Sequence, residues 1–391
     1  MIRGAILDIL FVSSKGSQYQ YYKALSKVVS FSSVVVTLFP GWGIKLLDTG
    51  LSLEIIKQGI DFHLKRKHRK YKGGGAPSVL RGGYAGFSAI YFSLIYLKFR
   101  YYLKQNTPKV ICLWNGHRLP EMAVRLAARG LGIKIAYFEN GLLPNTTTMD
   151  FSGVNAFSSL PRNKEFYLEY AQCKGGSSLA ATGLVVRHDH KRRKPVEHDD
   201  LKSNLKYIFV PFQVNFDSQV IINSPRVNSM EAFYDILLNV IESIEDKEIM
   251  FVIKEHPSDA RAYCELHNKH PRIIFTNNNT EDLIRNAWAI ITLNSSVGIE
   301  AAMLEKRVIV LGDACYSVDG MTLNVAPENK LVEAINSLEA WEPDLDITRS
   351  FFSYLTKEYC LPGAWQGQLE EVELHHLAKF ESKLKAKFTE G

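Results

Sequence analysis

The feature that most constrains this chain is a repeated alternation of short, β-branched apolar runs with longer segments of helical periodicity. Its clearest instance predicts a strand over 109–114, a helix over 120–129 and a second strand over 134–138. A strand–helix–strand unit of this kind needs a right-handed crossover, which makes its two strands parallel. The sequence therefore predicts an α/β protein.

Similar segments continue on both sides of this unit. Before it, the spacing predicts strands over 5–12 and 34–39 and a helix over 51–71 that ends at the glycine-rich run 72–77, where we expect a mobile loop. After it, the pattern predicts helices over 229–244, 280–286 and 297–304 and strands over 207–211, 249–254, 273–276, 289–293 and 308–311. Parallel sheets bind ligands at the carboxyl ends of their strands, so the polar residues that follow these strands form the candidate site.

The length of the chain allows two domains of ordinary size, because 391 residues exceed what a single core usually serves. Residues 187–203 are almost wholly polar and predict the linker between the domains. We therefore expect Rossmann-like domains over 1–190 and 204–343, with a cleft between them. Residues 344–391 return to helical periodicity, which predicts closing helices, without strands, that pack across both domains.

Composition excludes several classes of protein. Hydrophobic residues make up 46% of the chain, as in folded globular proteins, and no apolar run reaches the roughly 18 residues that cross a bilayer. The apolar run 5–12 is not followed by a small-residue cleavage site, so a secretory signal is not expected. The five cysteines form neither a disulfide framework nor a zinc pattern, which indicates a reducing, cytoplasmic setting.

Residues 65–102 combine basic and aromatic side chains, beginning with six consecutive basic residues at 65–70. Cations beside amphipathic aromatic rings suit an anionic lipid surface. A solvated helix end followed by a buried helix explains the same pattern. The net charge of +6 is modest and no RNA- or DNA-binding motif accompanies it, so a nucleic-acid partner is not expected.

The strand over 207–211 runs into a polar loop that contains Gln213 and brings the carboxylate of Asp217 to the top of the second sheet. That position favours a functional carboxylate. Aspartate also caps helical turns frequently, so a purely structural role for Asp217 explains the local sequence equally well.

Lys254, His256 and Pro257 stand at the end of another predicted strand. A histidine held by a following proline can donate a hydrogen bond to a phosphate oxygen, and the lysine adds positive charge. A single His-Pro pair is weak evidence, and a structural role is the alternative.

Asn294, Ser295 and Ser296 open a predicted helix that contains Gly298 and Glu300. The free amides and hydroxyls at a helix N-terminus bind a phosphate or a carboxylate readily. A serine N-cap with the glutamate as its capping-box partner predicts the same sequence, and the two interpretations are compatible.

In the first half, Asn115 and His117 follow one predicted strand, and Glu139 and Asn140 follow the next. A glutamate that faces a cleft between domains can carry a proton if partial burial raises its pKa toward neutrality. Glu139 is equally consistent with a cap or a turn.

Several familiar catalytic motifs do not occur in the sequence. GxxxxGK[ST], GxGxxG after a strand, GxSxG and HExxH are all missing, which argues against nucleotide hydrolysis, nicotinamide chemistry, serine esterase action and zincin chemistry. A DxD pair, the metal–diphosphate site of many glycosyltransferases, occurs only as Asp344 and Asp346 in the tail, and we discount it.

Four segments, taken in order, resemble motifs of the retaining β-Kdo transferases, which build bacterial capsule linkers and cap certain lipopolysaccharide O-antigens. The segments are 138–150, 210–217, 254–257 and 294–300. The chain looks closest to the Kdo-transferase module of WbbB, with capsule enzymes of the KpsC and KpsS type more distant. Each motif alone is unspecific, and the resemblance spans residues 110–325.

The resemblance implies a GT-B-like pair of Rossmann domains, with the acceptor side in the first and the CMP-sugar bound by the second. It implies that Asp217 attacks the anomeric carbon and that Glu139 is the acid/base across the cleft. The implied donor contacts are Gln213, Lys254, His256, Pro257, Asn294, Ser295, Ser296, Gly298 and Glu300, and the acceptor side holds Asn115, His117 and Asn140. The loop 140–144 lacks the longer arginine-containing insertion of capsule-type members, which leaves the acceptor open.

The chemistry of CMP-Kdo fits this assignment. Its single phosphate needs less charge neutralisation than a diphosphate, so a helix N-terminus and His256 can replace a metal, and we expect no cofactor. Retention of configuration requires two inversions, for which a nucleophilic Asp217 and an ionisable Glu139 suffice. We expect transfer through a covalent Kdo adduct of Asp217 to a lipid-linked or oligosaccharide acceptor.

Two alternatives remain open from the sequence. A transferase for another CMP-activated acid sugar, such as a sialyltransferase, would use the same His-Pro motif and serine pair, and donor assays would separate the two. A non-catalytic partner that binds glycan or lipid at the inner face of the inner membrane through 65–102 belongs to a different class. Undiminished glycan extension after Glu139→Gln and Asp217→Asn would favour it.

Overall fold

The computed structural model describes residues 7–38, 50–70, 78–174, 205–259, 261–366 and 374–389. The chain divides into two compact units, Met1–Ser159 with Tyr359–Gly391 and Leu160–Glu358. This division differs from the expected boundary in the linker 187–203, because residues 160–174 already belong to the second unit. The predicted linker and the predicted mobile loop 72–77 lie outside the described residues.

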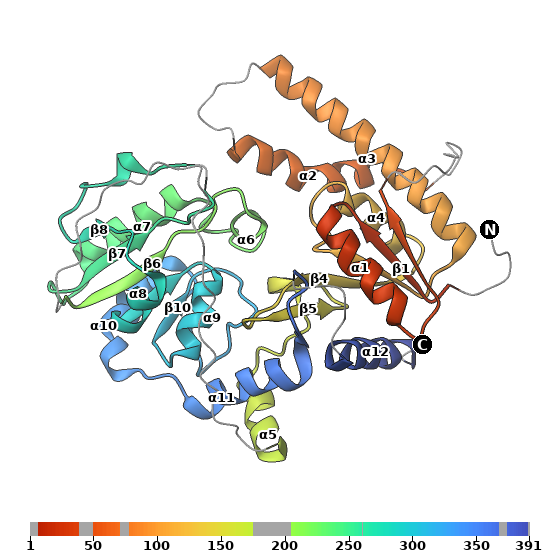
Figure 1. Cartoon of the computed structure of the whole chain (residues 1–391). Helices are drawn as coiled ribbons and strands as arrows, with labels where there is room; N and C mark the ends of the chain where they lie inside the picture. Colours follow the sequence, from red (N-terminus) through yellow and green to blue (C-terminus); the bar gives the residue numbers. More distant parts are fainter. Residues whose placement is uncertain are drawn as a thin grey trace. The chain divides into compact units, whose positions relative to one another are not determined.

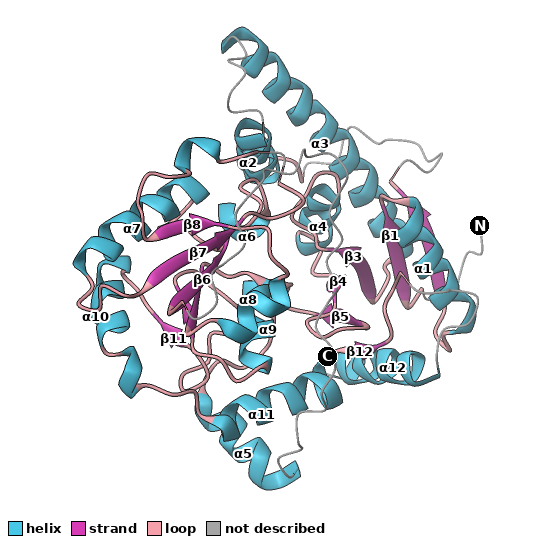
Figure 2. Cartoon of the chain, turned by 60° about the vertical axis from the view of Figure 1, so that its left-hand side comes forward, coloured by secondary structure: helices cyan, strands magenta, loops and turns pink. Residues whose placement is uncertain are grey.

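The first unit contains a six-stranded sheet of order β12-β5-β4-β3-β1-β2 (Figures 1 and 2). The four strands β2, β1, β3 and β4 pair in parallel, as the sequence predicts, whereas β5 and β12 are antiparallel to their neighbours. The strands are β1 (Ile9–Ser13), β2 (Ser33–Thr37), β3 (Val110–Trp114), β4 (Lys134–Asn140), β5 (Thr146–Asp150) and β12 (Leu361–Pro362).

Helices cover both faces of this sheet, so β1 and β3 are buried along their whole length. One face packs against α1 (Gly16–Val28) and α12 (Leu374–Thr389) in a core that contains Phe11, Phe138 and Phe380. The other face packs against α3 (Ser78–Asn106) and α4 (Glu121–Arg129), with α2 (Leu53–Lys70) lying on α3. Among the described helices, none is long and apolar enough to cross a membrane.

The second unit contains a six-stranded sheet of order β11-β10-β9-β6-β7-β8, in which all strands pair in parallel. Its strands are β6 (Tyr207–Pro211), β7 (Met250–Lys254), β8 (Ile273–Phe275), β9 (Ala289–Thr292), β10 (Val308–Val310) and β11 (Leu323–Asn324). Except for β11, each was predicted within a residue or two. The two sheets together confirm the α/β class with two Rossmann-like halves.

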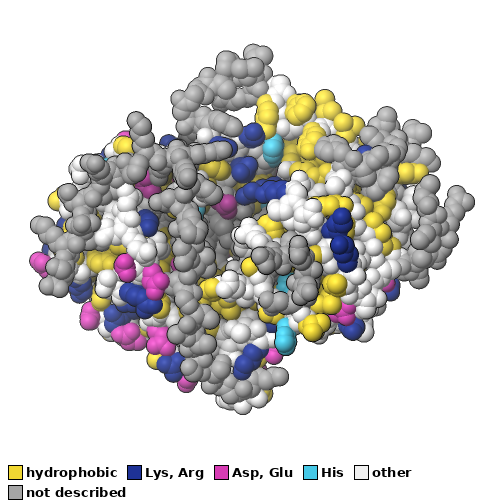
Figure 3. Space-filling view, viewed as in Figure 1, with side chains coloured by type: hydrophobic (Ala, Val, Ile, Leu, Met, Phe, Trp, Pro, Cys, Tyr) yellow, Lys and Arg dark blue, Asp and Glu magenta, His cyan; other side chains and the backbone are white. Residues whose placement is uncertain are grey.

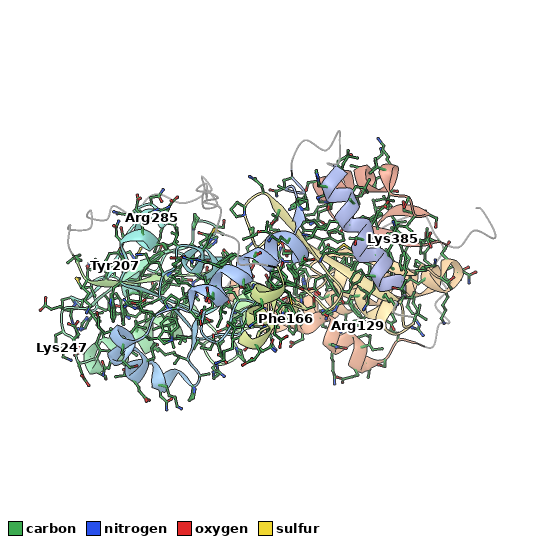
Figure 4. The ribbon with its side chains drawn as sticks, turned by 90° about the horizontal axis from the view of Figure 1, so that it is seen from below. Arg129, Phe166, Tyr207, Lys247, Arg285 and Lys385 are labelled. Atoms are coloured by element: carbon green, nitrogen blue, oxygen red, sulfur yellow. The ribbon has the colours of Figure 1, made fainter. Side chains whose placement is uncertain are left out.

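The helices of the second unit are α5 (Lys164–Lys174), α6 (Ser218–Ile221), α7 (Met230–Ser243), α8 (Thr280–Asn286), α9 (Ser296–Met303), α10 (Leu331–Asn336) and α11 (Leu345–Tyr354). α7 and α10 belong to the main core, and α9 lies along β9 and β10. α5 packs on α11 through aromatic side chains, of which Phe166 meets Tyr354 edge to face at 5.1 Å (Figure 4).

The tail differs from the expectation of helices alone. α11 belongs to the second unit, and the chain then adds the short strand β12 to the sheet of the first unit before α12 packs on that sheet. β5 was also missed, because three threonines at 146–148 resemble a polar loop. Thr147 is nevertheless fully buried, and its hydroxyl donates to the Gly363 carbonyl at 2.9 Å, which satisfies the polar group inside the sheet.

Candidate functional site

The second sheet has a topological switch point beside β6. The chain leaves β6 toward β7 and β8 and returns to β9 on the opposite side of β6, so the loops after β6 and β9 diverge. Open parallel sheets bind their ligands in the crevice that such loops form. The predicted donor residues at 213–217 and 294–296 follow these two strands directly.

Asp217 is the N-cap of α6. Its Oδ1 accepts hydrogen bonds from the backbone N–H of Gln219 at 3.0 Å and from the Ser218 hydroxyl at 3.1 Å. The capping role considered from the sequence is therefore confirmed. The half-buried carboxylate also stands at the carboxyl edge of the sheet, and its nucleophilic role stays a prediction.

Gln213 and Asn294 hold the two diverging loops together. The Gln213 Nε2 donates to Asn294 Oδ1 at 2.9 Å, and the Asn294 N–H donates to Gln213 Oε1 at 3.3 Å. Asn294 Nδ2 also donates to the carbonyls of Gln219 and Asn223 at 2.9 and 3.0 Å. Both side chains are buried, so they brace the site, and direct contact with a donor stays a prediction.

His256 and Lys254 follow β7, the strand next to β6. The Ser258 N–H donates to His256 Nδ1 at 3.0 Å, which places the proton of a neutral imidazole on Nε2. Nε2–H is thus the donor that the predicted phosphate contact requires. Lys254 Nζ donates to the Asn278 carbonyl at 2.7 Å, which ties the end of β7 to the loop after β8. Pro257 is partly exposed beside them.

The start of α9 is an N-capped helix end. The Ser295 hydroxyl accepts from the Val297 N–H at 3.2 Å, and Ser296 is exposed in the first turn. The expected capping box is wrong, because the third residue after the cap is Gly298 and the buried Glu300 lies beyond the first turn. Gly298 is packed against Tyr316, whose hydroxyl donates to the Ser295 carbonyl at 2.5 Å.

Asp259 is a buried member of the site that the sequence did not reveal. Its Oδ2 accepts from the Asn215 N–H at 3.1 Å and from the Tyr263 hydroxyl at 2.9 Å, which links the loop after β6 to the loop after β7. Burial is the main cause that raises the pKa of Tyr263, and the charge of Asp259 raises it further. No local spacing signals a bond across 44 residues, so only the fold shows that Asp259 holds the loops of Asp217 and His256 together.

In the first unit, Asn115 and Glu139 meet at the ends of β3 and β4. Asn115 Nδ2 donates to Glu139 Oε2 at 2.7 Å, and the Asn140 N–H donates to Oε1 at 3.0 Å. Asn115 has a φ of 60°, a left-handed conformation that asparagine tolerates better than most residues. Asn140 Oδ1 accepts from Trp365 Nε1 at 2.7 Å, so the tail contributes to this edge as well.

His117 is buried on the same loop as Asn115. Burial, and after it the charges of Arg125 and Arg129, lowers the pKa of His117 to about 4. Arg125 Nη1 lies 3.2 Å from His117 Nδ1, which accepts its hydrogen bond. A neutral imidazole held by an arginine suits a structural role, and the acceptor contact of His117 stays a prediction.

The predicted residues therefore gather at two sheet edges. The donor-side residues surround the ends of β6, β7 and β9, and the acceptor-side residues surround the ends of β3 and β4. Asp217 and Glu139 belong to different units, so their cooperation stays a prediction. Within the described ranges no three His, Cys, Asp or Glu side chains gather as a metal site would require, and metal-free chemistry also stays a prediction.

A family model described as "Capsule polysaccharide biosynthesis protein" matches residues 109–183 and 177–363. Protein FixF of Sinorhizobium fredii (strain NBRC 101917 / NGR234) is 38% identical over 275 residues, which cover 68% of this chain and 64% of that protein. The capsule polysaccharide export protein KpsS of Escherichia coli is 25% identical over 303 residues, covering 63% of this chain and 76% of that protein. The chain thus spans less than two thirds of the length of Protein FixF.

Solved structures show weaker likenesses. Thermosulfurimonas dismutans KpsC, a β-Kdo 2,7 transferase, aligns with a TM-score of 0.42 and 14% identity over 88% of this chain and 89% of that chain. The Staphylococcus aureus MnaA–UDP complex aligns at 0.37 and 14% identity over 98% and 97%. Likenesses at this level do not assign a function.

Proposed function

Because the chain belongs to the capsule polysaccharide biosynthesis protein family, we propose that it is a glycosyltransferase that moves Kdo from CMP-Kdo to a bacterial surface glycan. The residues that the family model matches run from β3 to β12 and make up most of the chain. The observation that carries the proposal is the group of side chains at the switch point of the second sheet. There a carboxylate, an imidazole and the start of a helix stand at the ends of three adjacent strands, β6, β7 and β9.

The donor requires two anionic groups to be recognised, the phosphate of CMP and the carboxylate of Kdo. The first turn of α9 offers backbone N–H groups and the exposed Ser296 hydroxyl, and a helix N-terminus favours negative charge. His256 adds an N–H donor on Nε2, oriented by the bond from the Ser258 N–H. Together these groups stabilise the departing monophosphate.

The proposed reaction proceeds in two displacements. The Asp217 carboxylate attacks the anomeric carbon, the bond from that carbon to the phosphate oxygen breaks, and CMP leaves with the electron pair. The acceptor hydroxyl then attacks the same carbon and displaces Asp217, while Glu139 takes the hydroxyl proton. Two inversions retain the configuration.

An intact-mass experiment tests the covalent step. We expect Glu139→Gln to accumulate a Kdo adduct after exposure to CMP-Kdo, because loss of the base slows the second displacement, and we expect no adduct with Asp217→Asn. Asp344→Asn is the matched control, because Asp344 caps α11 through bonds from two N–H groups, at 2.9 and 3.1 Å, much as Asp217 caps α6. Normal turnover by Asp217→Ala would contradict the proposal.

Donor competition addresses the two alternatives. CMP release with CMP-sialic acid at a rate similar to that with CMP-Kdo would favour a transferase for another CMP-activated acid sugar. If Glu139→Gln and Asp217→Asn leave glycan extension in a deletion strain unchanged, the chain is a non-catalytic binding partner, and the proposed activity is wrong.

We also propose that α2 and α3 contact an anionic membrane surface. Phe87, Ile90 and Leu94 recur at helical spacing on α3 and are 65%, 62% and 41% exposed, and Figure 3 shows hydrophobic side chains gathered over this region. The last turn of α2, which packs on α3, is basic throughout. Exposed apolar side chains beside a cationic helix end fit the interface of an anionic bilayer.

Vesicle sedimentation tests this contact. The protein should sediment with vesicles that contain phosphatidylglycerol and less with pure phosphatidylcholine, and the double variant Phe87→Ser, Ile90→Ser should remain in the supernatant. Leu374→Ser is the control, since Leu374 is even more exposed, at 82%, but lies on α12. Equal sedimentation of all three proteins would contradict the proposal.

A further inference from the structure

The first unit has a switch point of its own, between β1 and β3. The chain leaves β1 for β2 and returns to β3 on the opposite side of β1, so the loops after β1 and β3 diverge at the carboxyl edge of the sheet. This geometry forms a ligand crevice in open α/β sheets. The acceptor-side residues predicted from the sequence follow β3 and β4, and none of them follows β1.

Ser14 and Glu121 connect the two diverging loops. Glu121 begins α4, and its Oε1 accepts a hydrogen bond from the hydroxyl of Ser14, which directly follows β1. Only 7% of Glu121 is exposed, and this burial raises the pKa of its carboxyl group, against the lowering effect of Ser14, Lys15 and Arg118. Buried acids with raised pKa values are concentrated at functional sites.

Two buried polar atoms on α1 lack partners. Gln18 and Tyr22 are one helical turn apart and 2% and 0% exposed, and neither Gln18 Oε1 nor the Tyr22 hydroxyl has a hydrogen-bond partner among the described residues. Burial raises the pKa of Tyr22, and the Glu121 and Glu139 carboxylates are among the charges that raise it further, so its hydroxyl lies within electrostatic reach of both. An unsatisfied buried polar atom destabilises a folded protein, which calls for a compensating role.

We propose that Ser14, Gln18, Tyr22 and Glu121, the α1 cluster, bind hydroxyl groups of the acceptor sugar beside Glu139. This inference rests on the proposed transferase function. Ser14 and Glu121 keep some exposed surface at which the sugar enters, and the buried Gln18 and Tyr22 bind its hydroxyls behind them. The link from the Asn115 amide to Glu139 joins this cluster to the predicted acid/base, since Asn115 begins the loop after β3 and Glu121 directly follows that loop.

The chemistry of the cluster selects a neutral polyol over an anion. Gln18 Oε1 and the Glu121 carboxyl group accept hydrogen bonds, and a sugar hydroxyl donates one while accepting another from the Tyr22 hydroxyl. A phosphate or a carboxylate has no proton to donate to these oxygens and would be repelled by an ionised Glu121. The cluster therefore differs from the anion-binding start of α9 in the second unit.

Variants of α1 test the proposal with a matched control on the same helix. Gln18→Leu and Tyr22→Phe delete the unpartnered polar atoms at nearly constant volume. Tyr21→Phe is the control, because the equally buried Tyr21 hydroxyl already has an internal partner, His376 Nε2, at 2.8 Å. We expect Gln18→Leu and Tyr22→Phe to preserve or raise the melting temperature and Tyr21→Phe to lower it, since only the last removes a made hydrogen bond.

Two functional measurements complete the test. With methyl β-galactoside, methyl α-rhamnoside and methyl β-N-acetylglucosaminide as probes, saturation-transfer NMR should detect at least one glycoside on the wild-type protein. The affinity measured from this signal should fall about tenfold for Gln18→Leu and Tyr22→Phe and stay unchanged for Tyr21→Phe. Release of CMP from CMP-Kdo without acceptor should be detected for the wild-type protein and remain unchanged in Tyr21→Phe.

The outcomes separate the two proposals. Absence of binding by the wild-type protein, unchanged binding by Gln18→Leu and Tyr22→Phe, or an equal loss with Tyr21→Phe would overturn the α1 cluster as a sugar site. Absence of CMP release by the wild-type protein would overturn the transferase function while leaving glycoside binding to be judged on its own signal.

Discussion

At the scale of single residues, Gly298 determines how α9 presents its first turn. A Cβ at this position would lie 2.3 Å from the Tyr316 hydroxyl, which donates to the Ser295 carbonyl. We expect Gly298→Ala to displace Tyr316 and to destabilise the protein by roughly 1–3 kcal/mol, because the buried ring has no space to move into. A lower melting temperature would show the loss of stability. Slower CMP release would show that the displaced Tyr316 disturbs the first turn of α9.

Gly86→Ala is the control for this substitution. Gly86 is exposed within α3, and an added Cβ there meets nothing within 4 Å, so alanine should leave the melting temperature unchanged or raise it slightly. A Gly298→Ala protein as stable and as active as the Gly86→Ala protein would contradict the prediction.

His117 should make the stability of the first unit sensitive to acid. Its pKa is about 4 in the folded protein, whereas an unfolded histidine titrates near 6.5, so the unfolded chain binds a proton first as the pH falls. The stability that the neutral imidazole provides is complete above pH 6.5 and declines by up to about 3 kcal/mol as the pH falls to 4. Urea denaturation across this range measures the loss.

His117→Asn should flatten the pH dependence between 6.5 and 4, since the amide keeps an acceptor for Arg125 but does not titrate. His375→Asn, at an exposed position of α12, should leave the slope as in the wild type. Equal slopes for all three proteins would show that another group controls the acid response.

The sequence predicts where the candidate residues lie in the fold better than it predicts their hydrogen-bond partners. Asp217 and Ser295 follow parallel strands, so their place at a sheet edge comes from local pattern alone. The bonds that fix the site join distant segments, as Asp259 does with Asn215 and as Gln213 does with Asn294. Such pairings depend on strand order, which single-strand patterns do not encode.

At the scale of elements, α12 completes the core of the first unit. Phe380 is fully buried and lies 6.2 Å, centroid to centroid, from both Phe11 and Phe138. We expect Phe380→Ala to cost about 3–5 kcal/mol, because it removes a ring packed between α12 and the sheet and leaves a cavity. Thermal unfolding checks the loss, and Lys385→Ala on the exposed side of α12 should change stability by less than about 0.5 kcal/mol (Figure 4). A small effect of Phe380→Ala would mean that α12 is not part of this core.

The sequence predicts an element well when the element's own residues carry its pattern. The buried parallel strands β3, β6 and β7 were placed within a residue or two, because continuous β-branched runs are typical of strands covered on both faces. β5 and β12 were missed for the opposite reason. β5 contains polar residues, and β12 has two residues, so both become strands only by pairing with a neighbour.

At the scale of the whole molecule, the chain crosses between the two units twice. It enters the second unit at Leu160 and returns to the first at Tyr359, whose hydroxyl donates to the buried Asp150 at 2.9 Å. A domain boundary predicted from composition alone therefore lies too far toward the C-terminus. The polar segment 187–203 follows α5, and α5 already packs on α11. The return of the tail also explains why Trp365 reaches Asn140 beside Glu139.

The division into two units makes the proposed mechanism testable by mixing inactive chains. Asp217 lies in the second unit and Glu139 in the first, and the proposed double displacement needs Asp217 at the anomeric carbon and Glu139 at the hydroxyl that attacks it. If both groups of one chain serve one donor molecule, a mixture of Asp217→Asn and Glu139→Gln proteins should transfer Kdo no faster than the sum of the two alone. Mixing either variant with active Asp344→Asn protein controls for inhibition by mixing. Activity above that sum would show that the carboxylates of two different copies cooperate, and the assignment of both roles within one chain would then be wrong.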